Sequence, residues 1–479
     1  MSSPILRWKA GEVVARRIIS VILVGQFPER ERMNFLIRST IIAALGGLLF
    51  GFDTAVISGT TEWLREVFEL SSAGLGFSVA SALIGTILGA LVAGRPADLW
   101  GRRTTLIVIA VLYLVSAVGT ALAWDWYSFL FFRFIGGIAV GGASVVSPMY
   151  IAEISPATLR GRLVAVTQLN IVLGILLAFF SNYVIALLDL GAAEWRWMFG
   201  VEALPAAAFL GLLFLNPRSP RWLIMRGRIP EARQVLALLG TDRGSVDEEI
   251  REIQASIDLE HHSLREPLFQ AKYRRPILLA VAIAAFNQLS GINALMYYAP
   301  YIFRLAGGET ESALLQTVAV GGTNLLFTIA AMAVIDHFGR RKLMLAGSIG
   351  YILSLSATAA AFYYYGSNFT ETGGWIVLVS LLVFIASHAF GQGAVIWVFI
   401  SEIFPNRVRA RGQALGSFTH WFMAALISWT FPVIADVSGG HAFAFYAAMM
   451  VLQLLWVLYV MPETKGVPLE RIQKELGID

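Results

Sequence analysis

The feature that most constrains this chain is a series of long apolar segments. A helix that spans a lipid bilayer needs about 20 mostly apolar residues. Twelve such segments begin near residues 36, 74, 104, 127, 163, 197, 276, 312, 343, 375, 412 and 441. The composition agrees, because 57% of the residues are hydrophobic and only 14% are charged, unlike the balance of a soluble globular protein. The sequence therefore predicts an all-α membrane protein with twelve transmembrane helices.

Basic residues are distributed unevenly between the loops that join these segments. Eleven arginine and lysine residues lie in four short loops, at 95–103, 153–162, 336–342 and 402–411. The loops on the opposite side carry only Arg65 and Arg196. Because cytoplasmic loops are enriched in lysine and arginine, both termini are predicted to be cytoplasmic. The same enrichment explains the basic pI without a nucleic-acid partner.

Three motifs recur in the same order in the two halves of the chain. "GRPADLWGRRT" is answered by "DHFGRRK", "AEISPATLRG" by "SEIFPNRVRARG", and "NPRSPRW" by "MPETKG", at nearly one offset. Six spans per half is the layout of transporters whose two halves enclose a site at the middle of the membrane. The predicted parts are an N-terminal extension at 1–35, a six-helix half at 36–216, a cytosolic helical linker at 217–275, a six-helix half at 276–461 and a cytosolic tail at 462–479.

Two of these parts allow more than one interpretation. The linker is charged, and its apolar residues recur at helical spacing, as at Val235, Leu236 and Leu239, which favours short helices over a disordered linker. In the extension, Met33 stands just before the first span. Translation from Met33 is one interpretation, and an interfacial segment whose basic residues face anionic lipid is the other.

Each repeated loop places acidic residues beside arginines at the ends of helices. Such pairs could form a cytosolic gate that breaks when the inner side opens. Fixing of topology is the alternative role, although acidic residues contribute little to topology. The predicted gate consists of Asp98, Arg102, Arg103, Glu153, Arg160, Asp336, Arg340, Arg341, Glu402, Arg409 and Glu463.

Three ionised side chains lie inside the predicted spans and away from their ends. They are Asp53, Arg133 and Glu202, and each costs on the order of 3 kcal/mol near the bilayer centre. Counting residues from the span ends places all three at similar depth, so they could pair. Because a nearby arginine keeps a carboxylate ionised, a movement of Arg133 would change the proton affinity of Asp53. A static ion pair that only fixes helix packing is the alternative.

Amide and aromatic side chains gather in the seventh span, where "FNQLSGIN" precedes two tyrosines. A sugar has hydroxyl groups and apolar C–H faces, so its site needs amide donors and acceptors together with aromatic surface. Interhelical hydrogen bonding is the alternative for a lone amide, but a cluster favours a ligand. The candidates are Asn287, Gln288, Asn293 and Tyr297, with Gln168 and Asn324 from two other spans.

Residues 34–475 resemble the sugar porter family of the major facilitator superfamily, most closely its bacterial proton-coupled xylose and hexose symporters. The motifs that carry the resemblance are "GGLLFGFDTAVISG", "SPMYIAEISPATLRGRL", "SPRWL", "QLSGINALMYYAP", "SEIFPNRVRARG" and "PETKG". The resemblance implies the major facilitator fold in a bacterial inner membrane. It assigns Asp53 as the proton carrier, with Arg133 and Glu202 as its partners, since passive carriers of the family tend to have Asn in place of this Asp.

The resemblance also places the sugar against residues of both halves, but the chain departs from the family there. Gln392 stands where relatives have a tryptophan that stacks on the sugar, and His420 stands where many have Gln. Arg218 replaces a Glu, which predicts a weaker inner gate. The predicted sugar-binding residues are Phe50, Gln168, Asn287, Gln288, Asn293, Tyr297, Asn324, Gln392, Trp397, His420 and Trp421.

The function predicted from these features is import of a monosaccharide by proton symport through alternating access, by a monomer. No nucleophile and base arrangement, phosphate loop or metal-ligand spacing indicates an enzyme or a cofactor. An uncoupled facilitator for a sugar or polyol is the first alternative, and a non-transporting sugar sensor is the second.

Overall fold

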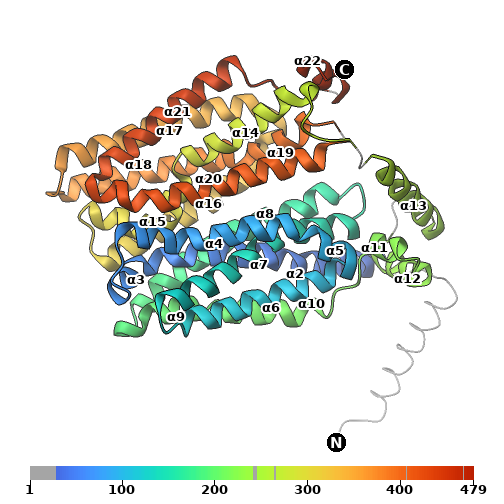
Figure 1. Ribbon diagram of the computed structural model, residues 1–479, viewed down its shortest axis with the longest axis horizontal. Helices are drawn as coiled ribbons and strands as arrows, with labels where there is room; N and C mark the ends of the chain where they lie inside the picture. The colour runs from blue at the N-terminus through green and yellow to red at the C-terminus, as the bar shows by residue number, and fades with distance from the viewer. Residues whose placement is uncertain (1–28, 241–244, 264–265, 406, 468, 479) are drawn as a thin grey trace, which may run out of the picture.

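The computed structural model describes residues 29–240, 245–263, 266–405, 407–467 and 469–478. Within these residues, twelve helical segments are long and apolar enough to cross a membrane, which confirms the predicted number. They form two bundles that lie side by side (Figure 1). We refer to residues 29–216 as the N half and to residues 271–461 as the C half.

The N half begins with a helix that is longer than predicted. Helix α2 starts at Glu29, so the expected end of the extension at residue 35 falls inside a helix, because "ERERMNF" contains no helix breaker. Residues 1–28 of the predicted extension lie outside the described residues. The helices are α2 (Glu29–Val56), η1 (Ile57–Thr60), α3 (Thr61–Val67), α4 (Ser72–Val92), α5 (Gly94–Trp100), α6 (Arg102–Ala121), α7 (Trp126–Ile154), α8 (Arg160–Ala186), η2 (Gly191–Ala193), α9 (Glu194–Gly200) and α10 (Ala203–Leu213).

The C half repeats the arrangement of long helices. It consists of η3 (Ala271–Tyr273), α14 (Arg274–Leu289), α15 (Ile292–Leu305), α16 (Thr310–Phe338), α17 (Arg340–Tyr365), α18 (Glu371–Phe390), α19 (Gln392–Ile403), α20 (Arg409–Val437) and α21 (Gly439–Tyr459). A short helix, α22 (Leu469–Leu476), comes after it.

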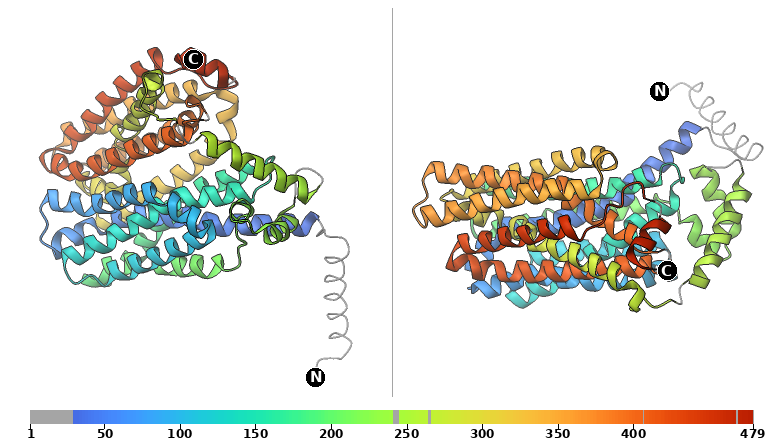
Figure 2. Two further views of the ribbon diagram at one scale, coloured as in Figure 1. Left: turned by 45° about the vertical axis from the view of Figure 1, so that its right-hand side comes forward. Right: turned by 90° about the horizontal axis from the view of Figure 1, so that it is seen from above.

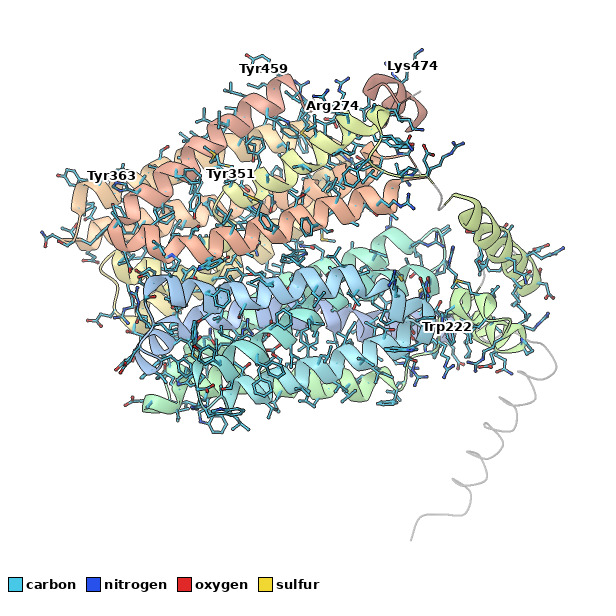
Figure 3. The ribbon with its side chains drawn as sticks, in the orientation of Figure 1. Trp222, Arg274, Tyr351, Tyr363, Tyr459 and Lys474 are labelled. Carbon is cyan, nitrogen blue, oxygen red and sulfur yellow. The ribbon has the colours of Figure 1, made fainter. Side chains whose placement is uncertain are left out.

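Three helices lie between the halves: α11 (Pro220–Met225), α12 (Ile229–Leu239) and α13 (Val246–Ser263). Their apolar faces pack together around Trp222, Leu236 and Ile250, and Trp222 lies where the linker meets the N half (Figure 3). Past α13, Glu266 accepts hydrogen bonds from Lys272 and from the Tyr273 hydroxyl, which hold the pKa of Glu266 below its usual value. This anchors the end of the linker to the C half.

The two halves touch mainly at one end of the molecule. We call the end that carries α11–α13 the linker end, and the opposite end the far end. The halves diverge toward the linker end (Figure 2) and pack together through α4 with α20, α8 with α16, and η1 with α15. At the far end the Trp429 carbonyl of α20 leaves no room for a Cβ on Gly76 of α4, and the rings of Phe77 and Trp429 lie 5.2 Å apart.

Three spans are broken in the middle, each beside a polar residue. Pro205 has no N–H to bond the Val201 carbonyl, and the sixth span is interrupted between α9 and α10 at Glu202. The seventh breaks at Gly291, whose φ of 84° and contact with the Tyr446 ring both require glycine. The tenth breaks at Gly391, just before Gln392. Broken helices commonly form the binding sites of transporters.

Candidate functional site

A buried ion pair lies inside the N half. Arg133 of α7 donates a hydrogen bond of 2.7 Å from Nη1 to Asp53 Oδ1 of α2, and one of 3.2 Å from Nη2 to the Asp53 carbonyl. Both side chains are 2% exposed, so the attraction between them is weakly screened. The Arg133 guanidinium also lies 5.3 Å from the centre of the Phe199 ring. The structure thus brings together the two residues that the sequence placed at similar depth.

Glu202 is the third member of this group, and it lies within electrostatic reach of both Asp53 and Arg133. Its carboxyl group lies within hydrogen-bonding reach of Asp53, and its Oε1 has no hydrogen-bond partner among the described residues. A hydrogen bond between two carboxyl groups requires that one of them carries a proton. The arrangement therefore suits a proton shared by Asp53 and Glu202, with Arg133 neutralising the remaining charge.

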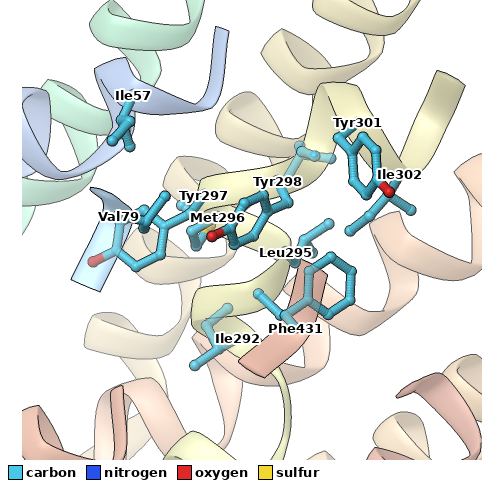
Figure 4. Close-up of a cluster of buried hydrophobic side chains, with 14 of the residues drawn as sticks. Ile57, Val79, Ile292, Leu295, Met296, Tyr297, Tyr298, Tyr301, Ile302 and Phe431 are labelled. Atoms are coloured by element: carbon cyan, nitrogen blue, oxygen red, sulfur yellow. The ribbon is translucent and has the colours of Figure 1, made fainter. Parts of the chain in front are cut away.

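Tyr297 connects this group to the C half. It lies on α15, is 2% exposed, and its hydroxyl is within electrostatic reach of Arg133 and Asp53. Figure 4 shows it in the same buried cluster as Ile57 and Val79 of the N half. Because Asn293 precedes it by one helical turn, Tyr297 joins the charged group to the amides around the break in the seventh span.

Those amides bond to one another. Gln288 Nε2 donates a hydrogen bond of 2.9 Å to Asn287 Oδ1, and Asn293 Nδ2 donates one of 2.8 Å to Gln288 Oε1. Gln288 Nε2 also lies 3.3 Å from the ring nitrogens of His420. Asn287 and Gln288 are almost fully buried, whereas Asn293 is partly exposed. The cluster presents donors and acceptors of the kind that a sugar needs.

Aromatic rings surround His420. The His420 ring lies 5.1 Å from the Trp397 ring and 4.8 Å from the Trp421 ring. Trp421 in turn lies 5.6 Å from the Phe50 ring of the N half, so this aromatic group crosses between the halves. Rings of this size supply the apolar surface that stacks against sugar C–H faces.

The Gln392 side chain points toward the interior of the C half. It is 1% exposed, accepts a 3.1 Å hydrogen bond from the Tyr351 hydroxyl and donates to Gln453 Oε1. Tyr351, inside the C half (Figure 3), also lies 2.6 Å from His388 Nδ1. Gln453 Nε2 in turn donates a hydrogen bond of 2.8 Å to Ser348 Oγ. These contacts join α17, α19 and α21, and direct binding of sugar by Gln392 would have to displace them.

The two remaining predicted amides lie on helices that pack across the halves. Gln168 is exposed on α8, whereas Asn324 on α16 is 8% exposed. The helices that carry them, α8 and α16, are neighbours across the two halves.

Among the described residues, the contacts of the predicted gate residues lie within each half. In the N half, Arg102 Nη2 lies 2.9 Å from Glu153 Oε1 and Arg102 Nη1 lies 3.0 Å from Asp98 Oδ1. Arg103 donates to the carbonyls of Leu213 and Phe214 at 3.1 and 2.9 Å. Arg160 donates 3.1 Å to the Ala152 carbonyl. These contacts are formed although the halves diverge at the linker end, so their role as a gate stays a prediction.

The C half repeats this set of contacts. Arg340 Nη2 lies 2.9 Å from Glu402 Oε1, and Arg341 Nε donates 3.1 Å to the Val457 carbonyl. Glu463 accepts from the backbone N–H groups of Arg340 and Arg341 at 3.0 and 3.1 Å, and so caps the first turn of α17. Arg409 donates 3.3 Å to the Phe404 carbonyl. The side chain of Asp336 lies outside the described part of the chain.

Twelve spans in two repeated halves, with a polar site where the halves meet, define a carrier of the major facilitator class. The chain belongs to the family described as "Sugar (and other) transporter", whose model matches residues 39–476. It is 38% identical to the D-xylose-proton symporter of Escherichia coli (strain K12), over 92% of this chain and 95% of that protein. It is 39% identical to the glucose transport protein of Synechocystis sp. (strain ATCC 27184 / PCC 6803 / Kazusa), over 92% and 97%.

Two solved structures of the E. coli xylose transporter XylE resemble the chain. The inward open conformation superimposes with a TM-score of 0.81 at 37% identity, covering 92% of this chain and 100% of that one. The proton:xylose symporter XylE bound to 6-bromo-6-deoxy-D-glucose gives a TM-score of 0.75 at 37% identity, covering 93% and 100%. The chain is therefore an integral membrane transporter, and its backbone is more similar to the inward open structure.

Proposed function

We propose that this protein imports a monosaccharide together with a proton by alternating access. The observation that carries the proposal is the Asp53–Arg133 pair, which is 2% exposed and adjoins, through Tyr297, the amide cluster around Gln288. An ionisable group inside a membrane is functional by default. Because Tyr297 of α15 reaches the proton site and Asn293 of α15 belongs to the amide cluster, each site can respond to occupation of the other.

In this proposal the residues have distinct roles. Asp53 takes up the proton, Glu202 shares it, and Arg133 moves relative to both when the halves rearrange. The sugar lies between the amides and the aromatic rings, against Asn287, Gln288, Asn293, His420 and Trp421. Names of similar proteins support a sugar as the substrate, since one acts on xylose and another is an arabinose-proton symporter of Bacillus subtilis (strain 168).

We further propose that the linker end faces the cytoplasm of a bacterial cell and that the protein works as a monomer in the inner membrane. The loops rich in arginine lie at that end, as the positive-inside rule requires. With the far end closed, this conformation would be inward open. The parts at 36–216, 217–275, 276–461 and 462–479 then correspond to the N half, a cytosolic linker, the C half and a cytosolic tail.

Uptake into proteoliposomes tests the proposal. Labelled xylose, arabinose, glucose, galactose, fructose and inositol are offered with and without an inward proton gradient, to wild type and to Asp53→Asn. We expect the gradient to drive accumulation of one sugar by wild type. The Asn variant should lose accumulation but keep exchange of sugar for sugar, because Asn cannot ionise.

A facilitator gives a different result. Uptake would then only equilibrate, and Asp53→Asn would behave as wild type, so that the buried pair would be structural. Binding of sugar without any uptake would instead favour a sensor.

A further inference from the structure

An ion pair joins the halves at the far end, outside the predicted sites. Arg65 Nη2, at the end of α3 in the N half, lies 2.7 Å from Asp436 Oδ2, at the end of α20 in the C half. Asp436 also accepts a hydrogen bond from Ser72 of the N half, and its Oδ1 accepts one of 2.6 Å from the Tyr301 hydroxyl. One carboxylate therefore binds groups from three helices and from both halves.

A second ion pair lies beside it with the opposite polarity. Arg304 of α15, in the C half, pairs with Glu62 of α3 in the N half, and Arg304 Nη1 also lies 3.2 Å from Thr310 Oγ1. Each half thus contributes one cation and one anion. Crossed pairs of this kind are satisfied in one docking register, because a shifted register would bring like charges together.

The same helix carries both the second pair and part of the proposed sugar site. Helix α15 begins beside the amide cluster with Asn293 in its first turn, is kinked at Tyr298 and contains Pro300. Its far end supplies Tyr301 and Arg304 to the two ion pairs. A displacement of α15 by a bound sugar therefore acts on both pairs.

We propose that Glu62, Arg65, Arg304 and Asp436 form an outer clasp, which holds the far end closed and must part before that end opens. They are positioning residues, since they act on access to the site without touching the ligand. The assignment of the far end to the outside rests on the proposed function, whereas the closing of this end by the clasp does not.

The size of the expected effect depends on exposure. The four side chains are 34% to 41% exposed, and loss of one exposed pair shifts an equilibrium by about two- to fivefold. Glu62 and Arg65 lie one turn apart on α3, so the two pairs are neighbours whose effects couple, and the loss of both is measured in its own variant. Carriers interconvert between states of similar free energy, so a shift of this size changes the population of the open state measurably.

Cysteine labelling tests the clasp directly, since the chain contains no cysteine. Val79 of α4 is 2% exposed in the cluster that includes Tyr297 of the C half. In a Val79→Cys background, we expect Asp436→Asn and Arg304→Gln each to speed reaction with a membrane-impermeant maleimide added to intact cells by about two- to fivefold. Glu66→Cys, an exposed position on α3, serves as the matched control, whose labelling should not change.

A charge swap separates the clasp from general loosening of the fold. Glu62→Arg and Arg304→Glu each break one pair, and together they rebuild it with reversed polarity. Labelling of Val79→Cys should rise in each single variant and return toward the starting rate in the double variant. Unchanged labelling in Asp436→Asn and Arg304→Gln, or a double variant that labels as fast as the singles, overturns the proposal.

Labelling needs neither sugar nor a proton gradient, so it tests the clasp separately from symport and rests on the proposed function only for the orientation of the far end. If labelling confirms the clasp but the protein accumulates no sugar, the clasp proposal holds and the symporter proposal is wrong. If protons drive accumulation but substitution of the four residues leaves labelling unchanged, the symporter proposal holds and the clasp proposal is wrong.

Discussion

The N half and the C half have matching contacts at the linker end but different interiors. Glu153 and Glu402 occupy equivalent places, and each accepts hydrogen bonds from one arginine and one hydroxyl group. The hydroxyl donors are Ser219 Oγ, 2.5 Å from Glu153, and Thr464 Oγ1, 2.6 Å from Glu402. Such shared contacts hold each six-helix unit together. The difference between the halves lies deeper, where one interior carries charge and the other carries neutral amides.

Hydrogen bonding separates the two interiors further. Among the described residues, twelve buried side-chain atoms lack a hydrogen-bond partner, and eleven of them belong to the N half. They include Arg133 Nε, Glu202 Oε1 and Tyr113 Oη, the last within electrostatic reach of Asp53. In the C half the buried amides bond to one another and to Tyr351. Spare bonding capacity suits a site that gains and loses a proton, whereas a saturated network suits a rigid site for a neutral ligand.

The largest expected effect comes from removing both carboxyl groups of the N half. Asp53→Asn and Glu202→Gln should each be tolerated, because the remaining carboxyl group can ionise beside Arg133. The double variant leaves Arg133, which cannot deprotonate, buried without an anion, at a cost of about 3–5 kcal/mol. We expect the loss of thermal stability in detergent, measured on purified protein, to exceed the sum of the single losses.

The matched pair in the C half should behave in the opposite way. Gln392→Met and Gln453→Met each leave a buried amide without its partner, whereas the double variant replaces both groups by apolar ones of similar shape, a change that can be nearly neutral. The double loss should therefore be smaller than the sum of the singles. Additive losses in both halves would remove the distinction between the two interiors.

A second prediction concerns the division of labour between sugar and proton. Gln288→Ala removes a side chain that bonds to Asn287, Asn293 and His420, and we expect sugar to bind about five- to thirtyfold more weakly, from the loss of roughly 1–2 kcal/mol of hydrogen bonding. The change in fluorescence of Trp397 and Trp421, whose rings lie beside His420, can report the dissociation constant.

Accumulation at saturating sugar distinguishes the roles. The ratio of sugar inside to sugar outside under a fixed proton gradient should stay as in wild type for Gln288→Ala. Loss of that ratio with an unchanged dissociation constant would instead assign Gln288 to proton coupling.

Features that depend on depth and periodicity could be predicted from the sequence, whereas features that depend on docking of the halves could not. The number of spans results from hydrophobic length, and the grouping of Asp53 with Arg133 results from their equal depth. The clasp was not predicted, because Arg65 and Asp436 lie 371 residues apart and Glu62 and Arg304 lie 242 apart. The hydrogen bond of Gln392 to Gln453 was not predicted for a related reason, since Gln453 lies on another helix.

The smallest expected effect tests the one position where the matched linker-end contacts differ. In the C half, Glu463 fills the space beside Gly339 and caps α17. In the N half, Arg218 stands at the equivalent position, and the Trp222 ring fills the space beside Gly101. The sequence suggested that Arg218 weakens the inner gate, but the bonds of Glu463 to Arg340 and Arg341 stay within one half.

Arg218→Glu should therefore raise stability rather than change access. A carboxylate near the first turn of α6 gains roughly 0.3–1 kcal/mol from the helix dipole, and Trp222, already packed against Gly101, limits the gain to the lower part of that range. We expect a small rise in melting temperature, with labelling of Val79→Cys unchanged; Arg218→Gln, which removes the positive charge without adding a negative one, should give about half the rise. Slower labelling of Val79→Cys in Arg218→Glu would contradict this interpretation. It would mean that the carboxylate shifts the balance between the two access states, and that position 218 belongs to the gate.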